Sequence, residues 1–254
     1  MQRIDLEKAH WKELEHASID MVILPWGATE PHNRHLPYGT DSLCSRAVAL
    51  EALSLISEDC PLSIAVLPVM PFGVNTGQRD LNLCMSIRPS VQYRLLEEIA
   101  LNLGEQKIPK LMIVNGHGGN NLKPLLRELQ QKVPEVFCCF TNWWTLKDGE
   151  DYFTEPGDHA GELETSTMQY LYPELVLPLS EAGDGSSTTF KPSGLSNRAV
   201  WAPRSWSKVS SDTGVGDPVA SSASKGERFF NDSAKVLAEY IADIAATDNA
   251  DLYG

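Results

Sequence analysis

The chain of 254 residues is long enough for one large α/β domain with a substantial core, and no linker divides it. Hydrophobic residues make up 42% and charged residues 22%, an ordinary globular composition that excludes a disordered or fibrous protein. The net charge of −13, with scattered lysine and arginine, argues against a nucleic-acid partner, and no apolar stretch approaches the ~18 residues that span a bilayer.

In chain order, short apolar runs alternate with helical patterns. The expected elements are a strand at 21–24, a helix at 41–56 capped by Asp41 or Ser42, a strand at 63–69, a helix at 90–103 capped by Ser90, a strand at 111–114, a helix at 121–132, a strand at 136–140, a helix at 161–172 and a closing helix at 219–245. This alternation predicts an α/β fold with a mostly parallel central sheet covered on both sides.

Residues 180–218 interrupt this alternation. They are rich in Ser, Thr, Gly and Pro, and they carry Trp201 and Trp206. We interpret the segment as an irregular arm or lid on a single domain that spans residues 1–254.

The first polar cluster, at 27–41, directly follows a predicted strand. It holds the carboxylates Glu30 and Asp41 and the imidazoles His32 and His35 within twelve residues. Open α/β sheets bind ligands at the carboxyl ends of strands, and mixed oxygen and nitrogen ligands suit Zn, Mn or Fe(II). A polar loop with surface histidines explains the Glu-x-His part alone, but it explains the continuation to Asp41 less well.

The second cluster, at 115–121, follows another predicted strand and places His117 between glycines. A tight strand-to-helix turn with an asparagine cap is one interpretation, and a phosphate cradle at a helix start is another. Nucleotide binding is the weaker alternative, because the segment has neither the Lys-Ser/Thr of a P-loop nor GxGxxG.

The third cluster, at 158–166, contains His159, Glu162 and Glu164. His159 and Glu162 are three apart and share a face once the helix begins, whereas Glu162 and Glu164 are two apart and point to different sides. The helix dipole explains acidic residues near a helix start but leaves His159 unexplained.

The five cysteines are an odd number with no CxxC pair, which is typical of a reducing compartment. The N-terminal octapeptide has no apolar core like that of a signal peptide. We therefore expect a cytoplasmic protein.

Together and in this order, the three clusters resemble the creatininase (creatinine amidohydrolase) family. The family pattern is roughly G-[AS]-x-E-x-H-G-x-H-L-P-x-x-T-D, then N-G-H-x-x-N, then H-[AG]-G-x-x-E-T-S, and it corresponds here to 27–41, 115–120 and 159–166. Segment 214–226 also resembles the family's closing segment. The resemblance implies a three-layer α/β/α fold, two divalent metal ions per chain (Zn with Mn, Mg or Fe) and a homo-oligomer, often a hexamer.

Carried over by position, the resemblance implies that Glu30, Asp41 and His117 hold one metal ion. His32 would help to hold the other, with Asp41 bridging the two. Creatininase has a glutamate ligand where this chain has Gly119, and the pattern of relatives implies that Glu162 replaces it.

The same resemblance makes His159 the proton shuttle beside the leaving group, with Glu164 supporting the site. His35 is a competing proton donor or a residue that orients a ligand. Trp144, Gly118 and Asn120 are expected to contact the substrate.

Two departures from the family pattern bear on the substrate. Asn33 stands where the family has glycine, so the turn must tolerate a side chain. Creatininase also has two tryptophans that close over the substrate as an aromatic lid. One of them stands shortly before the third-motif histidine, where residues 155–158 of this chain contain no tryptophan. Trp143 or Trp144 matches the other. The missing tryptophan weakens the case for creatinine itself.

These observations predict a metal-dependent hydrolase of a non-peptide C–N bond (amide, cyclic amide or formamide) in a small molecule, with activated water as nucleophile. The family alternatives are a peptidase and a formylamino-pyrimidine nucleotide deformylase. The deformylase needs a basic pocket. Four basic side chains fit two interpretations equally, as such a pocket or as solvated surface charges: Lys191, Arg198, Arg204 and Lys208. A metal-dependent small-molecule binding protein is the non-enzyme alternative.

Overall fold

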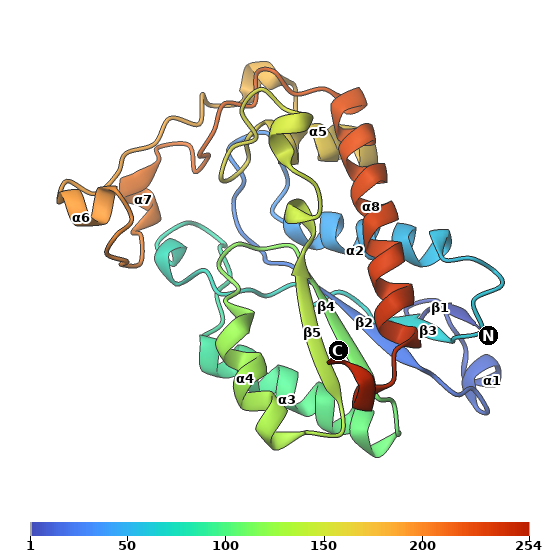
Figure 1. The fold of residues 1–254 in the computed structure, drawn as a ribbon. Coiled ribbons are helices and arrows are strands. Elements are labelled where there is room, and N and C mark those ends of the chain that lie inside the picture. Colours follow the sequence, from blue (N-terminus) through green and yellow to red (C-terminus); the bar gives the residue numbers. More distant parts are fainter. Residues whose placement is uncertain (1, 254) are drawn as a thin grey trace.

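The computed structural model describes residues 2–253 and places a five-stranded sheet at the centre of the molecule (Figure 1). Every neighbouring pair is parallel, in the order β1-β3-β2-β4-β5. The strands are β1 (Arg3–Asp5), β2 (Met21–Trp26), β3 (Ile64–Val66), β4 (Lys110–Asn115) and β5 (Phe137–Asn142). The predicted α/β fold with a parallel sheet is confirmed, although the three-residue strand β1 was too short to be predicted.

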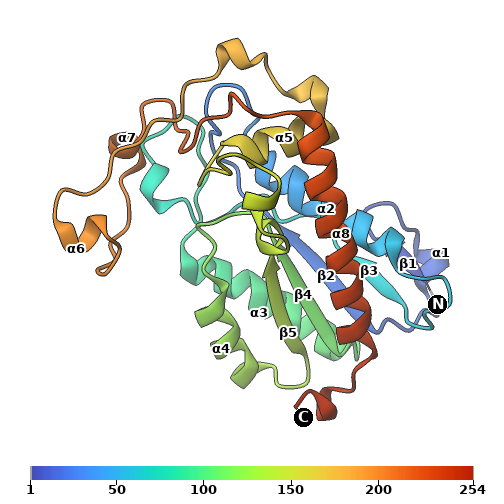
Figure 2. The same cartoon turned by 45° about the horizontal axis from the view of Figure 1, so that its top comes forward.

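Helices cover both faces of this sheet, which confirms the three-layer arrangement (Figures 1 and 2). One face carries α2 (Thr40–Leu55), α5 (Glu162–Leu171) and α8 (Ala223–Ala246), and the other carries α3 (Pro89–Glu105) and α4 (Leu122–Lys132). The four-residue helix α1 (Trp11–Leu14) precedes β2. Helices α2, α3 and α4 each connect one strand to the next in the chain, as a parallel sheet requires, and α5 follows β5.

Two apolar cores sandwich the central strands. All residues of β2 and β4 are buried, and neighbouring side chains point to opposite faces. Ile23 therefore packs into the core beneath α2, α5 and α8, whereas Leu24 packs into the core beneath α3 and α4. The rigid central strands thus fix where the loops after β2 and β4 begin.

Two helices begin differently from the sequence prediction. Gly39, not Asp41 or Ser42, is the N-cap of α2, so Asp41 lies within its first turn. Arg88 is the N-cap of α3, where Pro89 takes the first helical position instead of Ser90 acting as a cap. Proline suits that position because its ring already has helical φ. Asp41 is consequently free to point elsewhere.

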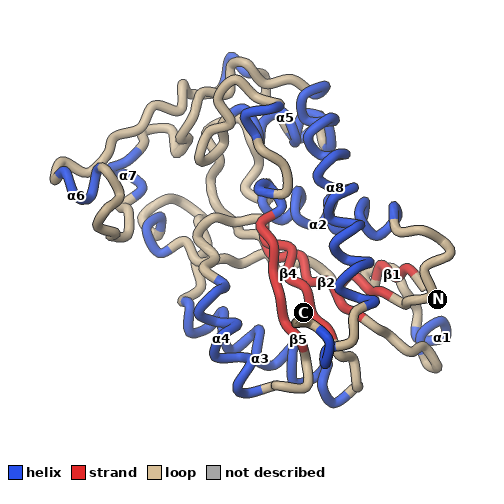
Figure 3. Tube along the Cα trace, in the orientation of Figure 1, coloured by secondary structure: helices blue, strands red, loops and turns tan. Residues whose placement is uncertain are grey.

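Between α5 and α8 the chain makes a long excursion that is mostly loop (Figure 3). Its two short helices, α6 (Ser193–Ser196) and α7 (Trp206–Val209), project away from the sheet in two views (Figures 1 and 2). We call residues 186–212 the arm. Among residues 2–253, no helix is both long and apolar enough to cross a bilayer.

Candidate metal centre

The loops after β2 and β4 bring the first two polar clusters together. The strands pair directly, with Trp26 opposite Asn115 at their carboxyl ends. Glu30 and His32 follow β2, and His117 follows β4. The side chains reach the same point above the sheet edge, where parallel α/β folds place ligands.

Asp41 meets these residues from the first turn of α2. Its Oδ1 lies 2.9 Å from His32 Nε2, and its Oδ2 lies 3.0 Å from His117 Nδ1. His117 Nδ1 also lies 2.8 Å from Glu30 Oε1. None of the four residues is more than 7% exposed. One aspartate thus presents one oxygen to each of two imidazoles.

A close approach of Gly116 to α2 makes this meeting possible. A Cβ added at Gly116 would lie 2.4 Å from the carbonyl oxygen of Asp41. We therefore expect Gly116→Ala to lower the free energy of unfolding by about 1–3 kcal/mol, because the turn and α2 must separate. Urea denaturation measures this loss. Gly39→Ala is the matched control, since its Cβ would have ordinary contact distances of 3.9 Å, and an equal loss in both variants would contradict the prediction.

The third cluster completes the site through His159 and Glu164. His159 Nδ1 and Glu30 Oε1 are 3.9 Å apart, as are Glu164 Oε1 and His32 Nε2. The rings of His32 and His159 lie 4.2 Å apart between centroids. These side chains form three groups, and within each group the ligand atoms all lie within 4.8 Å of one another. The groups are Glu30, Asp41 and His117; His32, Asp41 and Glu164; and Glu30, His32 and His159.

The structure does not bring Glu162 into this cluster, although the resemblance implies that Glu162 replaces the ligand missing at position 119. Its Oε1 pairs with Lys225, and its Oε2 accepts hydrogen bonds from the backbone amides of Thr154 and Glu155, both at 2.9 Å. Glu164, two residues later on α5, faces the site instead. Because positions two apart on a helix point to different sides, only one of the two glutamates is able to do so.

Gly119 itself has no space for a ligand side chain. A Cβ there would lie 2.3 Å from both His117 Nε2 and the carbonyl oxygen of Val74. Glycine allows the turn to pack against the imidazole ring of His117, and the same close packing leaves no room for a glutamate at position 119.

Charges of opposite sign face one another in the cluster. Burial lowers the pKa of His32, but the carboxylates of Asp41 and Glu164 outweigh it and raise that pKa to about 10. Burial raises the pKa of Asp41, yet the neighbouring imidazoles hold it well below its usual range. Burial raises the pKa of Glu164 despite His32 and His159. The carboxylates thus attract positive charge into a site shielded from water.

The residues present fit divalent cations. Asp41 Oδ2 is buried and accepts no well-directed hydrogen bond, although it lies near His117. Three carboxylates and three imidazoles converge, a donor set of oxygen and nitrogen that suits Zn or Mn. A bound cation would give Asp41 Oδ2 a partner and would also neutralise negative charge on the carboxylates.

The residues expected to contact substrate lie in different environments. Gly118 is exposed, with open space beside it. Trp144 is half-buried and packs against the core around α8. Asn120 is buried, and its Oδ1 accepts from the Val74 amide at 3.1 Å and from Gln92 at 2.9 Å. The Asn120 side chain therefore braces the turn that carries His117.

Sequence reasoning gave no role near the cluster to Gln78 or Trp206, and it left the role of His35 open. Gln78 donates to Glu30, and His35 Nε2 lies 2.8 Å from Thr165 Oγ1. Trp206, from the arm, stands edge-on to His159 at 5.3 Å. No spacing rule links these positions, because loops of unpredictable course carry them. The unusual backbone of Asn33 could be anticipated, because this residue stands where the family has glycine. Asn33 adopts φ 52°, a conformation that asparagine tolerates.

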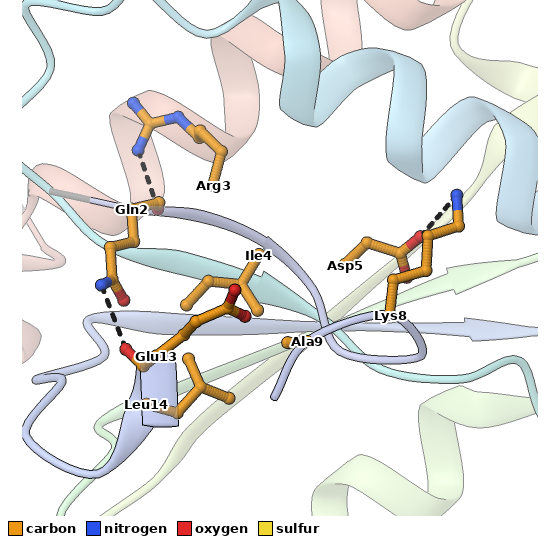
Figure 4. A pocket seen from close by; sticks show the side chains of 8 residues that line it. All are labelled: Gln2, Arg3, Ile4, Asp5, Lys8, Ala9, Glu13 and Leu14. Carbon is orange, nitrogen blue, oxygen red and sulfur yellow. Dashed lines mark hydrogen bonds and ion pairs between the residues drawn. The ribbon is translucent and has the colours of Figure 1, made fainter. Parts of the chain in front are cut away.

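None of the four basic residues of the arm forms an ion pair with a residue of the cluster. Lys191, Arg198 and Lys208 are exposed, and Arg204 pairs with Asp158 at 2.7 Å while covering the Trp206 ring at 4.3 Å. A cavity of about 430 Å³ lies elsewhere, between β1 and α1, and shares no residue with the cluster (Figure 4).

Known proteins resemble this chain over most of its length. The family model of creatininase, described as creatinine amidohydrolase, matches residues 7–241. A solved structure of a putative creatinine amidohydrolase from Bacteroides fragilis is 40% identical, with a TM-score of 0.93 and 100% of both chains covered. The mycofactocin precursor peptide peptidase of Mycolicibacterium smegmatis is 27% identical over 89% of this chain and 86% of the relative. A structure described as "Creatininase Mn" has a TM-score of 0.79 at 22% identity, covers 96% of this chain and 99% of its own, and shows likeness of fold.

Proposed function

Because the chain belongs to the creatininase family, we propose that it is a divalent-metal-dependent hydrolase of a C–N bond in a small amide, cyclic amide or formamide. The observation that carries the proposal is the position of Asp41, whose two oxygens face His32 and His117 separately. A carboxylate placed in this way is suited to bridge two cations.

Two of the three groups of donor atoms support a division of ligands between two ions. Glu30, Asp41 and His117 would hold the first, and His32, Asp41 and Glu164 the second. We therefore propose that Glu164 takes the part that the family resemblance implied for Glu162. Divalent ions bound here would supply an activated water as nucleophile and polarise the scissile carbonyl.

His159 is the proposed donor of a proton to the leaving nitrogen. Its Nε2 lies 2.9 Å from the carbonyl oxygen of Pro31, which can only accept, so Nε2 carries a hydrogen in the neutral ring. Nδ1 then faces the cluster and is the atom that takes up or releases the catalytic proton. The edge-on contact with Trp206 limits rotation of the ring.

We expect His159→Asn to lower kcat by about 10²–10⁴-fold, because general acid catalysis is lost while the five ligands stay in place. Steady-state kinetics at matched metal content measure the change. His16→Asn is the control, since the His16 side chain is 91% exposed and lies outside the cluster. A normal kcat in His159→Asn would remove His159 from the mechanism.

A peptide substrate is the second candidate, favoured by the match to the mycofactocin precursor peptide peptidase over most of both chains. The bond broken is again an amide, so the same cluster would serve. The two candidates differ in substrate size and not in chemistry.

One experiment tests both candidates. The purified chain is loaded with Mn or Zn, its bound metal is counted, and it is offered cyclic amides, formamides and short peptides. Release of amine from one class, abolished by a chelator, is the expected result. Two bound ions without hydrolysis of any class would contradict an enzymatic function and favour a small-molecule binding protein.

A further inference from the structure

Gln78 contacts the metal centre from a segment remote in sequence. It ends the 3-10 helix η1 (Thr76–Gln78), and its side chain is only 5% exposed. Its Nε2 donates a hydrogen bond to Glu30 Oε2. The other oxygen of Glu30, Oε1, faces His117 and His159. The two oxygens of this carboxylate therefore have different surroundings.

The orientation of the Gln78 amide follows from its two neighbours. The Cys84 thiol donates to Gln78 Oε1 at 3.6 Å. Burial, reinforced by the charge of Glu30, raises the pKa of Cys84 to about 12, so the thiol keeps its hydrogen at neutral pH. Glu30 as a carboxylate only accepts. Both contacts thus require Nε2 to point at Glu30.

The backbone of Gln78 is held as firmly as its side chain. Its amide donates to Asn75 at 3.0 Å, and its carbonyl accepts from Leu81 at 3.0 Å. The arm packs directly on the preceding residue, since a Cβ on Gly77 would lie 2.1 Å from the carbonyl oxygen of Arg204. The amide therefore has little freedom to follow a rotating carboxylate.

We propose that Gln78 is a positioning residue that confines Glu30 to metal binding through Oε1 alone. Carboxylates bind cations through one oxygen or two, and a donor fixed on the second oxygen selects the single-oxygen mode. The inference rests on the proposed function only in that Glu30 must bind an ion. The substrate does not enter it.

The test uses Co(II) as the probe in the full-length chain. Gln78→Met keeps the length of the side chain but removes the donor. We expect Co(II) to leave this variant about 10–100-fold faster into excess chelator, the usual effect of losing a partner of a metal ligand. We also expect its visible absorption to change as Glu30 becomes free to bind through both oxygens. Gln169→Met, at a partly buried glutamine bonded to Ser221, is the matched control.

A second pair of variants tests the proposal even if Gln78→Met does not fold. Cys84→Ala removes the donor that orients the amide, and Cys84→Ser restores one. Faster Co(II) release in the alanine variant, reversed in the serine variant, would support the proposal. Wild-type release and an unchanged spectrum in every folded variant would overturn it. A wild-type chain that binds no Co(II) would overturn this inference and the metal-dependent function together, whereas bound Co(II) without amide hydrolysis would count against the hydrolase function alone.

Discussion

Asp41→Asn is expected to abolish hydrolysis, with a rate at least ~10³-fold below wild type. Asp41 belongs to two of the three donor groups, so its loss weakens both ion sites together. The asparagine side chain has one oxygen where aspartate has two. Its NH₂ group would then face one of the two imidazoles, where an acceptor oxygen stood before. The variant therefore loses either the contact with His32 Nε2, 2.9 Å in the wild type, or the contact with His117 Nδ1, 3.0 Å in the wild type.

Metal analysis and amide turnover on the same preparation measure this effect. Asp20→Asn is the control, because Asp20 accepts a hydrogen bond from the Ser63 amide and lies outside the donor groups. Two tightly bound ions and normal turnover in Asp41→Asn would show that Asp41 does not bridge the ions.

Glu162→Gln is expected to destabilise the fold while leaving the metal content unchanged. The Glu162 side chain is 1% exposed, and its partner Lys225 is 29% exposed. Breaking a fully buried pair costs ~3–5 kcal/mol, and because Lys225 also reaches water we expect about 2–4 kcal/mol here. For a chain of this size the Tm falls by roughly 5–15 °C.

Calorimetry and metal analysis separate this role from that of a ligand. Lys225→Met should reproduce the loss of stability, and the double variant should lose less than the sum of the two. Glu227→Gln, on the exposed side of α8, is the control. Glu164→Gln should show the opposite pattern, with loss of bound metal at near-normal stability of the metal-free chain. Loss of metal in Glu162→Gln would restore Glu162 as a ligand.

The contrast between these glutamates depends on how α8 meets α5. A Cβ on Gly226 would lie 2.0 Å from the carbonyl oxygen of Ser166, so glycine allows the two helices to touch. That approach brings Lys225, the preceding residue, to Glu162. One face of α5 is thereby occupied by α8, and Glu164 is left on the side of His32.

Local sequence patterns predict the alternation of strands and helices, the parallel sheet and the four residues at the centre of the cluster. Each of these depends on local signals: apolar runs such as 111–114, glycines beside His117, and polar residues directly after strands. Parallel strands place such residues at one sheet edge, so the convergence of Glu30, His32 and His117 was predictable without coordinates, whereas Asp41 joins them from the first turn of α2.

Packing between distant segments sets which glutamate of α5 faces the cluster and which other residues support the cluster. Helical spacing showed that Glu162 and Glu164 point to different sides, but the rotation of α5 is set by its contact with α8, a helix distant in the chain. Gln78 reaches Glu30 across 48 positions through a loop with no periodic pattern. Side-chain contacts between segments so far apart depend on packing, which local propensity does not encode.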